Sequence, residues 1–184
     1  GVTLRASPND DPGNNQHPFL GKTYTDRMYK YDNLFGQVYA KGKLPYGFSY
    51  SVTFSPRYDM LREYNHQSAN NPNLATRKGI VDRRNQTVYS WNLDNQLNWS
   101  GKFGKHSIEA TFLANAEKFQ SWNTNIHAEN FAPNDNLSFN SIQSATLPFT
   151  ASSDDQYETG DALMGRVNYN YNQRYFLTLT ARRD

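Results

Sequence analysis

Four side chains that could bind a polar ligand lie in one long segment without an apolar period. They are Trp122, His127, Phe131 and Phe139, and Asn and Ser residues surround them. Aromatic rings offer flat platforms and amides exchange hydrogen bonds, so this combination suits sugar or peptide ligands. The alternative, which we favour, is that these rings pack the segment against itself or against a partner.

Charged side chains at the polar positions of predicted strands form a second candidate set. Arg57, Asp94 and Arg166 each lie in an alternating run, on the side opposite its apolar residues. They could touch a cargo molecule inside a barrel. Pairing across strands, or contact with a plug domain, is the plainer interpretation, because polarity is general in barrel interiors.

Neither catalysis nor a bound cofactor is indicated. The four histidines show no metal-binding spacing, and Cys is absent, which excludes disulfides and thiolate metal sites. The acidic run of Asp154, Asp155, Glu158 and Asp161 lacks the spacing of a calcium loop, which favours a solvated segment. A net charge of +2 gives no reason to expect nucleic acid. We therefore predict no enzyme, no metal and no cofactor.

Strict alternation is the strongest structural signal in the chain. Leu163, Gly165, Val167, Tyr169 and Tyr171 share one parity, opposite polar residues, and the pattern resumes from Tyr175 to Ala181. Period two predicts strands with one apolar and one polar face, and the short polar break predicts a β-hairpin.

Similar alternation predicts about six antiparallel strands between residues 32 and 184. Short turns near 45–47, 101–105 and 172–173 separate some strands, and long loops near 67–84 and 122–158 separate others. Residues 1–31, rich in Pro, Gly and Asn, are expected to form an extracellular loop. Transmembrane barrels have short turns on one side and long loops on the other, so the fold class predicted is an antiparallel transmembrane β-barrel segment.

Composition agrees with a barrel wall. Only 36% of residues are hydrophobic, yet 15% are aromatic, because alternate strand positions alone must be apolar. The chain has no apolar run of about 18 residues, so no transmembrane helix is expected.

Two stretches of sequence carry a family resemblance. The first runs from Ala162 to Asp184, and the second contains Glu129-Asn130-Phe131 followed by Asp135, Leu137 and Phe139. With them, the region from about Asp32 to Asp184 resembles the SusC/RagA-like TonB-dependent transporters of Bacteroidetes outer membranes.

The resemblance implies an internal sector of a plugged barrel of about 22 strands. It further implies a location in the bacterial outer membrane in contact with its lipid, and import of oligosaccharides, glycans or peptides. The implied partners are a SusD-like surface lipoprotein and TonB, the latter through a segment upstream of residue 1. Two alternatives stay open: a barrel protein or fragment that is a client or subunit of an assembly or secretion machine, and a small soluble β-sheet binding module.

Overall fold

The computed structural model describes residues 22–71, 77–131, 135–146 and 148–184. The chain divides into two compact units. The loop unit comprises Gly1–Asp32, Asp59–Thr87 and Trp122–Asp155, and the turn unit comprises Asn33–Tyr58, Val88–Ser121 and Gln156–Asp184. Among the described residues, no helix is long and apolar enough to cross a membrane.

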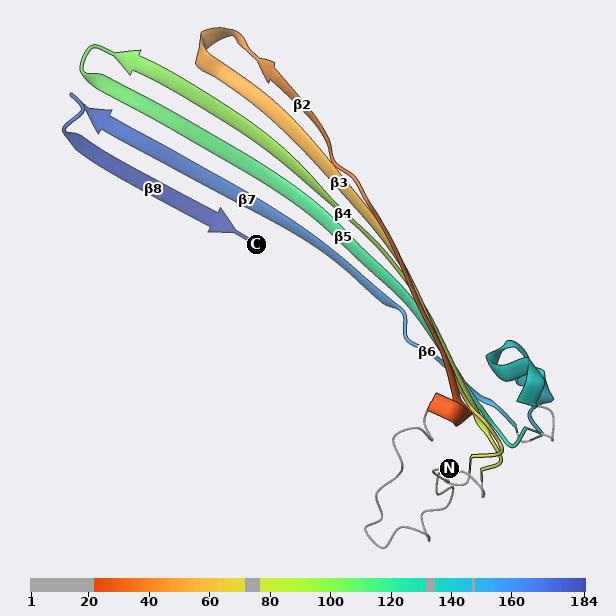
Figure 1. The fold of residues 1–184 in the computed structure, drawn as a ribbon. Helices are drawn as coiled ribbons and strands as arrows, with labels where there is room; N and C mark the ends of the chain where they lie inside the picture. The colour runs from red at the N-terminus through yellow and green to blue at the C-terminus, as the bar shows by residue number, and fades with distance from the viewer. Residues whose placement is uncertain (1–21, 72–76, 132–134, 147) are drawn as a thin grey trace, which may run out of the picture. The chain divides into compact units, whose positions relative to one another are not determined.

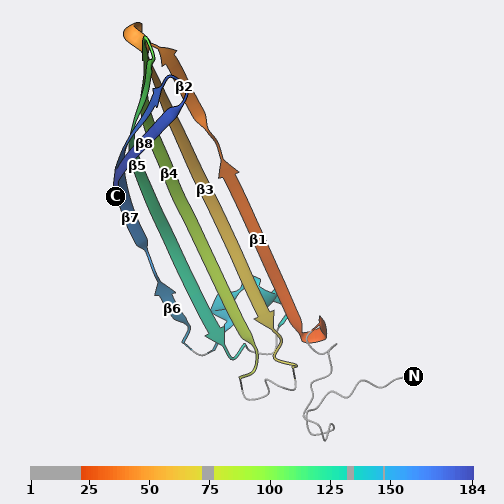
Figure 2. The same cartoon turned by 90° about the vertical axis from the view of Figure 1, so that its left-hand side faces the viewer.

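The described residues form an antiparallel meander in one sheet (Figures 1 and 2). Its strands are β1 (Thr25–Phe35), β2 (Val38–Lys43), β3 (Phe48–Gln67), β4 (Ile80–Phe103), β5 (His106–Glu129), β6 (Thr150–Ser153), β7 (Gln156–Tyr171) and β8 (Tyr175–Arg183). The hydrogen-bonded order is β1-β3-β4-β5-β7-β8, with β2 beside β3 and β6 beside β5. β1 and β2 share one position beside β3, and β6 and β7 share one position beside β5, so the eight strands occupy six positions in the sheet. This open antiparallel sheet confirms the predicted barrel segment of about six strands.

In the turn unit, the register places apolar residues opposite apolar residues. Val167 lies between Ala110 of β5 and Leu179 of β8, and Tyr169 lies between Ile108 and Leu177. Because paired residues share a face, these strands together form one apolar face. Its larger side chains remain exposed, including Val167 at 43% and Leu179 at 63%.

The opposite face of the turn unit is linked by polar side chains. Thr178 donates to Asn168 at 3.0 Å across β7 and β8. Asn115 of β5 donates to Asp94 at 2.8 Å and to Asn92 at 3.0 Å on β4. Cross-strand hydrogen bonds of this kind fix the register from the polar side while the apolar side stays uncovered.

Aromatic rings gather around the short turns of the turn unit. The Trp99 indole donates to the carbonyl oxygen of Tyr46 at 3.0 Å, in the turn η2 (Pro45–Gly47). Gly47 has φ +83, and a Cβ there would lie 2.3 Å from the Ser100 oxygen, so only glycine fits. Tyr171 and Tyr175 stack at 6.5 Å beside the β7–β8 turn. Such rings are typical of a membrane–water interface.

Proline explains why one strand position is split in two. Pro56 of β3 has no N–H to give to its neighbour, and the neighbouring strand breaks opposite it between β1 and β2. Gly36, in the break, still donates to the Pro56 oxygen at 3.1 Å.

The strands extend further into the expected loops than alternation indicates. β1 begins at Thr25, inside the loop expected over 1–31, whose first 21 residues lie outside the described part. β4 begins at Ile80 rather than after 84, and the loop expected over 122–158 contains the end of β5, all of β6 and the start of β7. These boundaries were wrong because backbone pairing does not require an alternating apolar face.

The two faces of β7 predict opposite responses to the same substitution. In the full-length protein, Val167→Arg should cost about 2–4 kcal/mol of folding free energy, because the predicted barrel wall would expose the new cation to hydrocarbon. Asn168→Arg, the matched control on the polar face, should cost less than about 1 kcal/mol, for the loss of an exposed hydrogen bond. Urea-dependent unfolding in lipid vesicles measures both values, and equal costs would contradict the assignment of faces.

Candidate functional site

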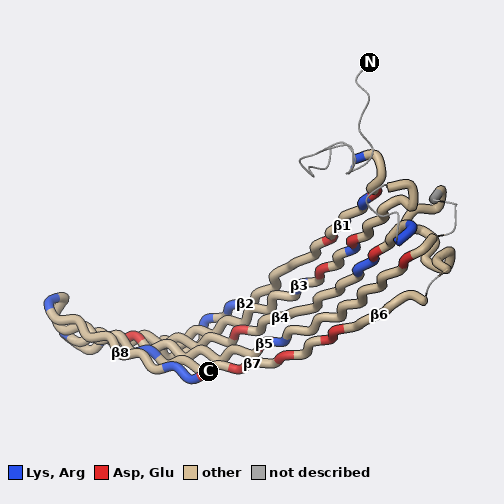
Figure 3. Tube along the Cα trace, turned by 90° about the horizontal axis from the view of Figure 1, so that it is seen from below, with Lys and Arg blue, Asp and Glu red and all other residues tan. Residues whose placement is uncertain are grey.

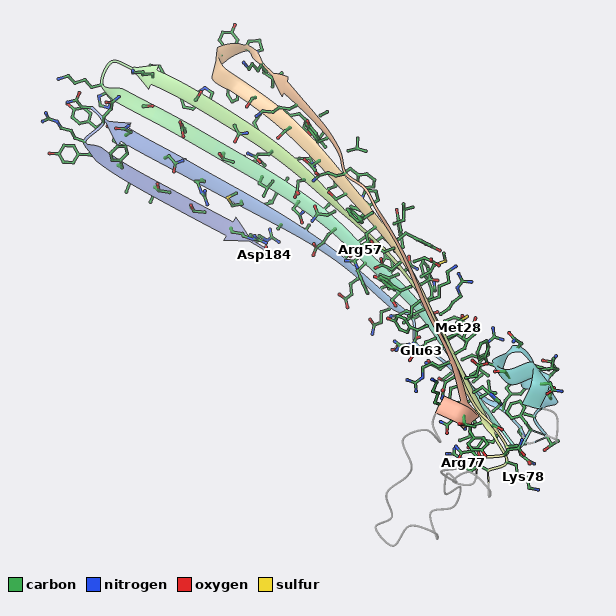
Figure 4. The ribbon with its side chains drawn as sticks, viewed as in Figure 1. Met28, Arg57, Glu63, Arg77, Lys78 and Asp184 are labelled. Carbon is green, nitrogen blue, oxygen red and sulfur yellow. The ribbon has the colours of Figure 1, made fainter. Side chains whose placement is uncertain are left out.

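The loop unit contains a polar pocket of about 410 Å³, lined by residues of β1, β3, β4, β5 and β6. Its charged and titratable lining residues are Arg27, Glu63, Asp82, Arg83, Arg84 and His127. Figure 3 shows Lys, Arg, Asp and Glu interspersed along these strands, and Figure 4 marks Glu63. The lining contains no Phe, Tyr or Trp, so a ligand there would be held by charge and hydrogen bonds.

A chain of four charged groups borders this pocket. His127 Nδ1 lies 2.6 Å from Asp82 Oδ1, and His127 Nε2 lies 2.8 Å from Glu129 Oε1. The same Glu129 oxygen accepts from Arg77, whose Nε lies 3.0 Å away. The network Arg77–Glu129–His127–Asp82 thus joins the segment before β4 to β4 itself and to the end of β5.

The chemistry of imidazole sets the charge of this network. Neutral imidazole has one N–H, so it can donate to only one of its two carboxylate neighbours, whereas imidazolium donates to both. Hydrogen bonds to Asp82 and Glu129 therefore raise the pKa of His127 above its usual value. Hydrogen bonds from Arg77 and His127 lower the pKa of Glu129 to about 2.

Backbone hydrogen bonds reinforce the same junction. The Asn130 N–H donates to the carbonyl oxygens of Arg77 at 3.0 Å and Gly79 at 3.2 Å, and the Phe131 N–H donates to that of Lys78 at 3.0 Å. Since Arg77 is also bound through its side chain, both the backbone and the charge network hold this segment against the end of β5.

A small apolar cluster packs elsewhere in the loop unit. Val81, Ala128 and Phe131 are buried, and Phe139, Ile142 and Ala145 pack against them. Phe139 lies in η4 (Asp135–Asn140), with its ring 5.7 Å from that of Tyr64. The segment after β5 is therefore anchored by its own side chains.

The candidate residues of the long segment have different surroundings. His127 lines the pocket, whereas Phe131 is 5% exposed and Phe139 packs beside it, so both rings are engaged in packing. Trp122 of β5 is 39% exposed and is not among the pocket's lining residues.

The charged candidates of the strands lie in the turn unit, apart from this pocket. Asp94 accepts from Asn115, and Arg166 donates to Thr180 Oγ1 at 3.3 Å. Arg57 lies on β3 in the same unit. None of the three lines the pocket.

Sequence reasoning missed most of the residues that form the site. Asp82 and Arg84 were assigned to a loop, and Arg27, Glu63 and Arg77 were not singled out. Their spacing along the chain carries no signal, because pairing of distant strands brings them together. Within the described part of the chain, no group of three or more His, Cys, Asp or Glu side chains is placed to hold a metal ion.

Comparisons with known proteins identify the family. No family model matches the sequence. A curated relative, the TonB-dependent receptor P26 of Formosa agariphila, is 31% identical over 139 residues, which cover 72% of this chain. The chain is thus similar to a segment of a TonB-dependent receptor, which confirms the predicted resemblance to the SusC/RagA-like transporters. It spans 14% of the length of that relative.

Solved structures of RagAB share the fold. The structure of the RagAB peptide transporter matches 90% of this chain with a TM-score of 0.78 at 13% identity. The open-open state of the RagAB peptide importer matches 91% with a TM-score of 0.79 at 12% identity. This chain covers 18% of each matched chain. The likeness confirms that this receptor segment has the fold of a RagA-like barrel wall.

The charge network predicts a window of pH in which the junction is most stable. His127, with its raised pKa, contributes stability that is complete below 6.5 and is lost as pH rises through the raised value. Glu129, with its lowered pKa, contributes stability that is present above 4.5 and is lost as pH falls towards about 2.

Hydrogen exchange can measure this window in the full-length receptor. Protection of the Asn130 and Phe131 amides, corrected for intrinsic rates, should be greatest between about pH 4.5 and 6.5. The variant Glu129→Gln should remove the acid limb of the profile and keep the alkaline limb that the His127–Asp82 pair produces, while Glu158→Gln, in β7 of the turn unit, should change neither limb. A flat profile in the unaltered protein would contradict the assigned linkage.

Proposed function

We propose that this chain forms part of the wall of an outer-membrane transporter that imports oligosaccharides, glycans or peptides with energy from TonB. The observation that carries the proposal is the uncovered apolar face of the turn unit. A soluble sheet must bury such a face, whereas a barrel wall presents it to lipid. Among the described residues, the buried hydrophobic ones are Ile80, Val81, Ala128 and Phe131, all in the loop unit.

Strand length and loop length support the same assignment. β4 and β5 each contain 24 residues, more than twice the roughly 9–11 that cross a bilayer. Parts of these strands must therefore lie in water, which suits the charged residues of the loop unit. The short turns belong to the turn unit and the long connections to the loop unit, as expected for the periplasmic and extracellular sides.

The relatives support receptor or transporter activity rather than an enzyme. The curated relative is named a TonB-dependent receptor, and the solved neighbours are described as a peptide transporter and importer. A SusD-like surface lipoprotein is the partner that we propose outside the membrane, with TonB on the periplasmic side. The mixed charges of the pocket favour a polar cargo.

Uptake by the full-length protein in its native host tests the proposal. Import of labelled peptides or oligosaccharides should require both TonB and the proton-motive force, because the barrel itself has no energy source. A tonB deletion strain and an uncoupler provide the comparison, and a surface lipoprotein should copurify from detergent. Import that continues unchanged without TonB, or a receptor recovered in the soluble fraction, would count against the proposed function.

A further inference from the structure

The pocket of the loop unit is lined by guanidinium groups as well as carboxylates. Arg27 and Arg84 contribute two guanidinium groups, beside the carboxylates of Glu63 and Asp82, whereas the guanidinium of Arg83 lies over Tyr64 on the other face of the strand. Asp82 is already bound by His127. The raised pKa of His127 adds further positive charge as pH falls. With His127 protonated, the lining carries one more positive than negative charge.

The guanidinium groups have no carboxylate partners. Among the described residues, neither of these two arginines forms an ion pair with Asp or Glu. Arg84 donates to two neutral amides, Asn123 Oδ1 at 3.3 Å and Gln86 Oε1 at 3.2 Å. Since a guanidinium has five N–H donors, these two bonds position Arg84 and leave further donors for a ligand.

One lining residue of the pocket carries a buried polar atom that lacks a partner. Asn65 Oδ1 forms no hydrogen bond within the described part of the chain. Buried acceptors are normally satisfied by protein, water or ligand, so this atom fits a ligand that also carries a donor group.

We propose that this pocket binds a carboxylate group of the transported cargo, through Arg84 and Arg27. Arginine binds planar carboxylates with two parallel hydrogen bonds, and charge-assisted bonds of this kind are stronger than neutral ones. The absence of Phe, Tyr and Trp from the lining argues against a neutral sugar held by ring stacking. The inference rests on the proposed function, since it treats the ligand as cargo.

Two sources can supply such a carboxylate, a peptide C-terminus or a uronic acid. The purified full-length transporter is titrated by calorimetry at low ionic strength with two matched probe pairs. One pair is N-acetyl-tetraalanine and its C-terminal amide, and the other is trigalacturonate and its methyl ester. At least one acid should bind about tenfold or more tightly than its neutral counterpart, and the pair that shows the preference identifies the source.

Substitutions locate the binding groups. Arg84→Gln and Arg27→Gln should each weaken binding of the preferred acid by about 10-fold to 100-fold, because each removes a charged hydrogen bond. Arg174→Gln, the same change in the exposed β7–β8 turn, should leave affinity unaltered. Heat-modifiable migration on gels confirms that each variant is a folded barrel.

Three results would overturn the proposal: equal affinity for acid and neutral probes, unchanged affinity in both folded arginine variants, or no saturable binding of either acid. The uptake assay separates this failure from a failure of the proposed function. TonB-dependent import together with any of these results rejects only the carboxylate site. Import independent of TonB rejects the transporter proposal whatever the binding shows.

Discussion

Hydrogen bonding between neighbouring strands is the constraint on which the rest of this structure depends. In hydrocarbon a backbone N–H or C=O has no water to bind, so each must pair within the sheet. Pairing fixes the register, and register decides which side chains share a face. In the turn unit, Val167 meets Ala110 and Leu179, whereas Asn168 meets Glu109 and Thr178. A slip of one residue would exchange these faces, so the cross-strand amide and hydroxyl bonds on the polar side protect the apolar side.

Strand pairing is interrupted at two places in the described part of the sheet, and at each a backbone hydrogen bond bridges the break. Pro56 removes one donor, and the neighbouring strand divides at that point. Between β6 and β7 the break falls at Asp154 and Asp155, and the Asp154 N–H still donates to Asn123 at 3.0 Å. β8 pairs with β7, and within the described residues it lies at one end of the order. An edge of this kind exposes unpaired N–H and C=O groups, which native proteins pair or cover.

The sequence predicted the fold better than the site, for a physical reason. Alternation is a local pattern, so the spacing of apolar residues alone predicts the apolar face of each strand. Leu163 and Val167 mark that face in β7, and Leu179 marks it in β8. The family resemblance then predicted that these strands belong to the wall of a larger barrel. Strand ends were poorly predicted, because Asp82 and Arg84 continue β4 without an apolar period. The network of Arg77, Asp82, His127 and Glu129 spans about fifty residues and depends on a register that no local pattern encodes.

The contrast between the two units follows from the solvent that each must satisfy. In the turn unit, large apolar side chains are exposed and most charged residues lie on the opposite face, an arrangement that the proposed contact with lipid explains. In the loop unit, water permits charges on its strands, and stability comes from a small cluster around Val81 and from ion pairs. Such a region holds its segments less tightly than a core would, because exposed ion pairs contribute little. For the proposed role in admitting and releasing cargo, this weaker packing is better suited than a rigid apolar core.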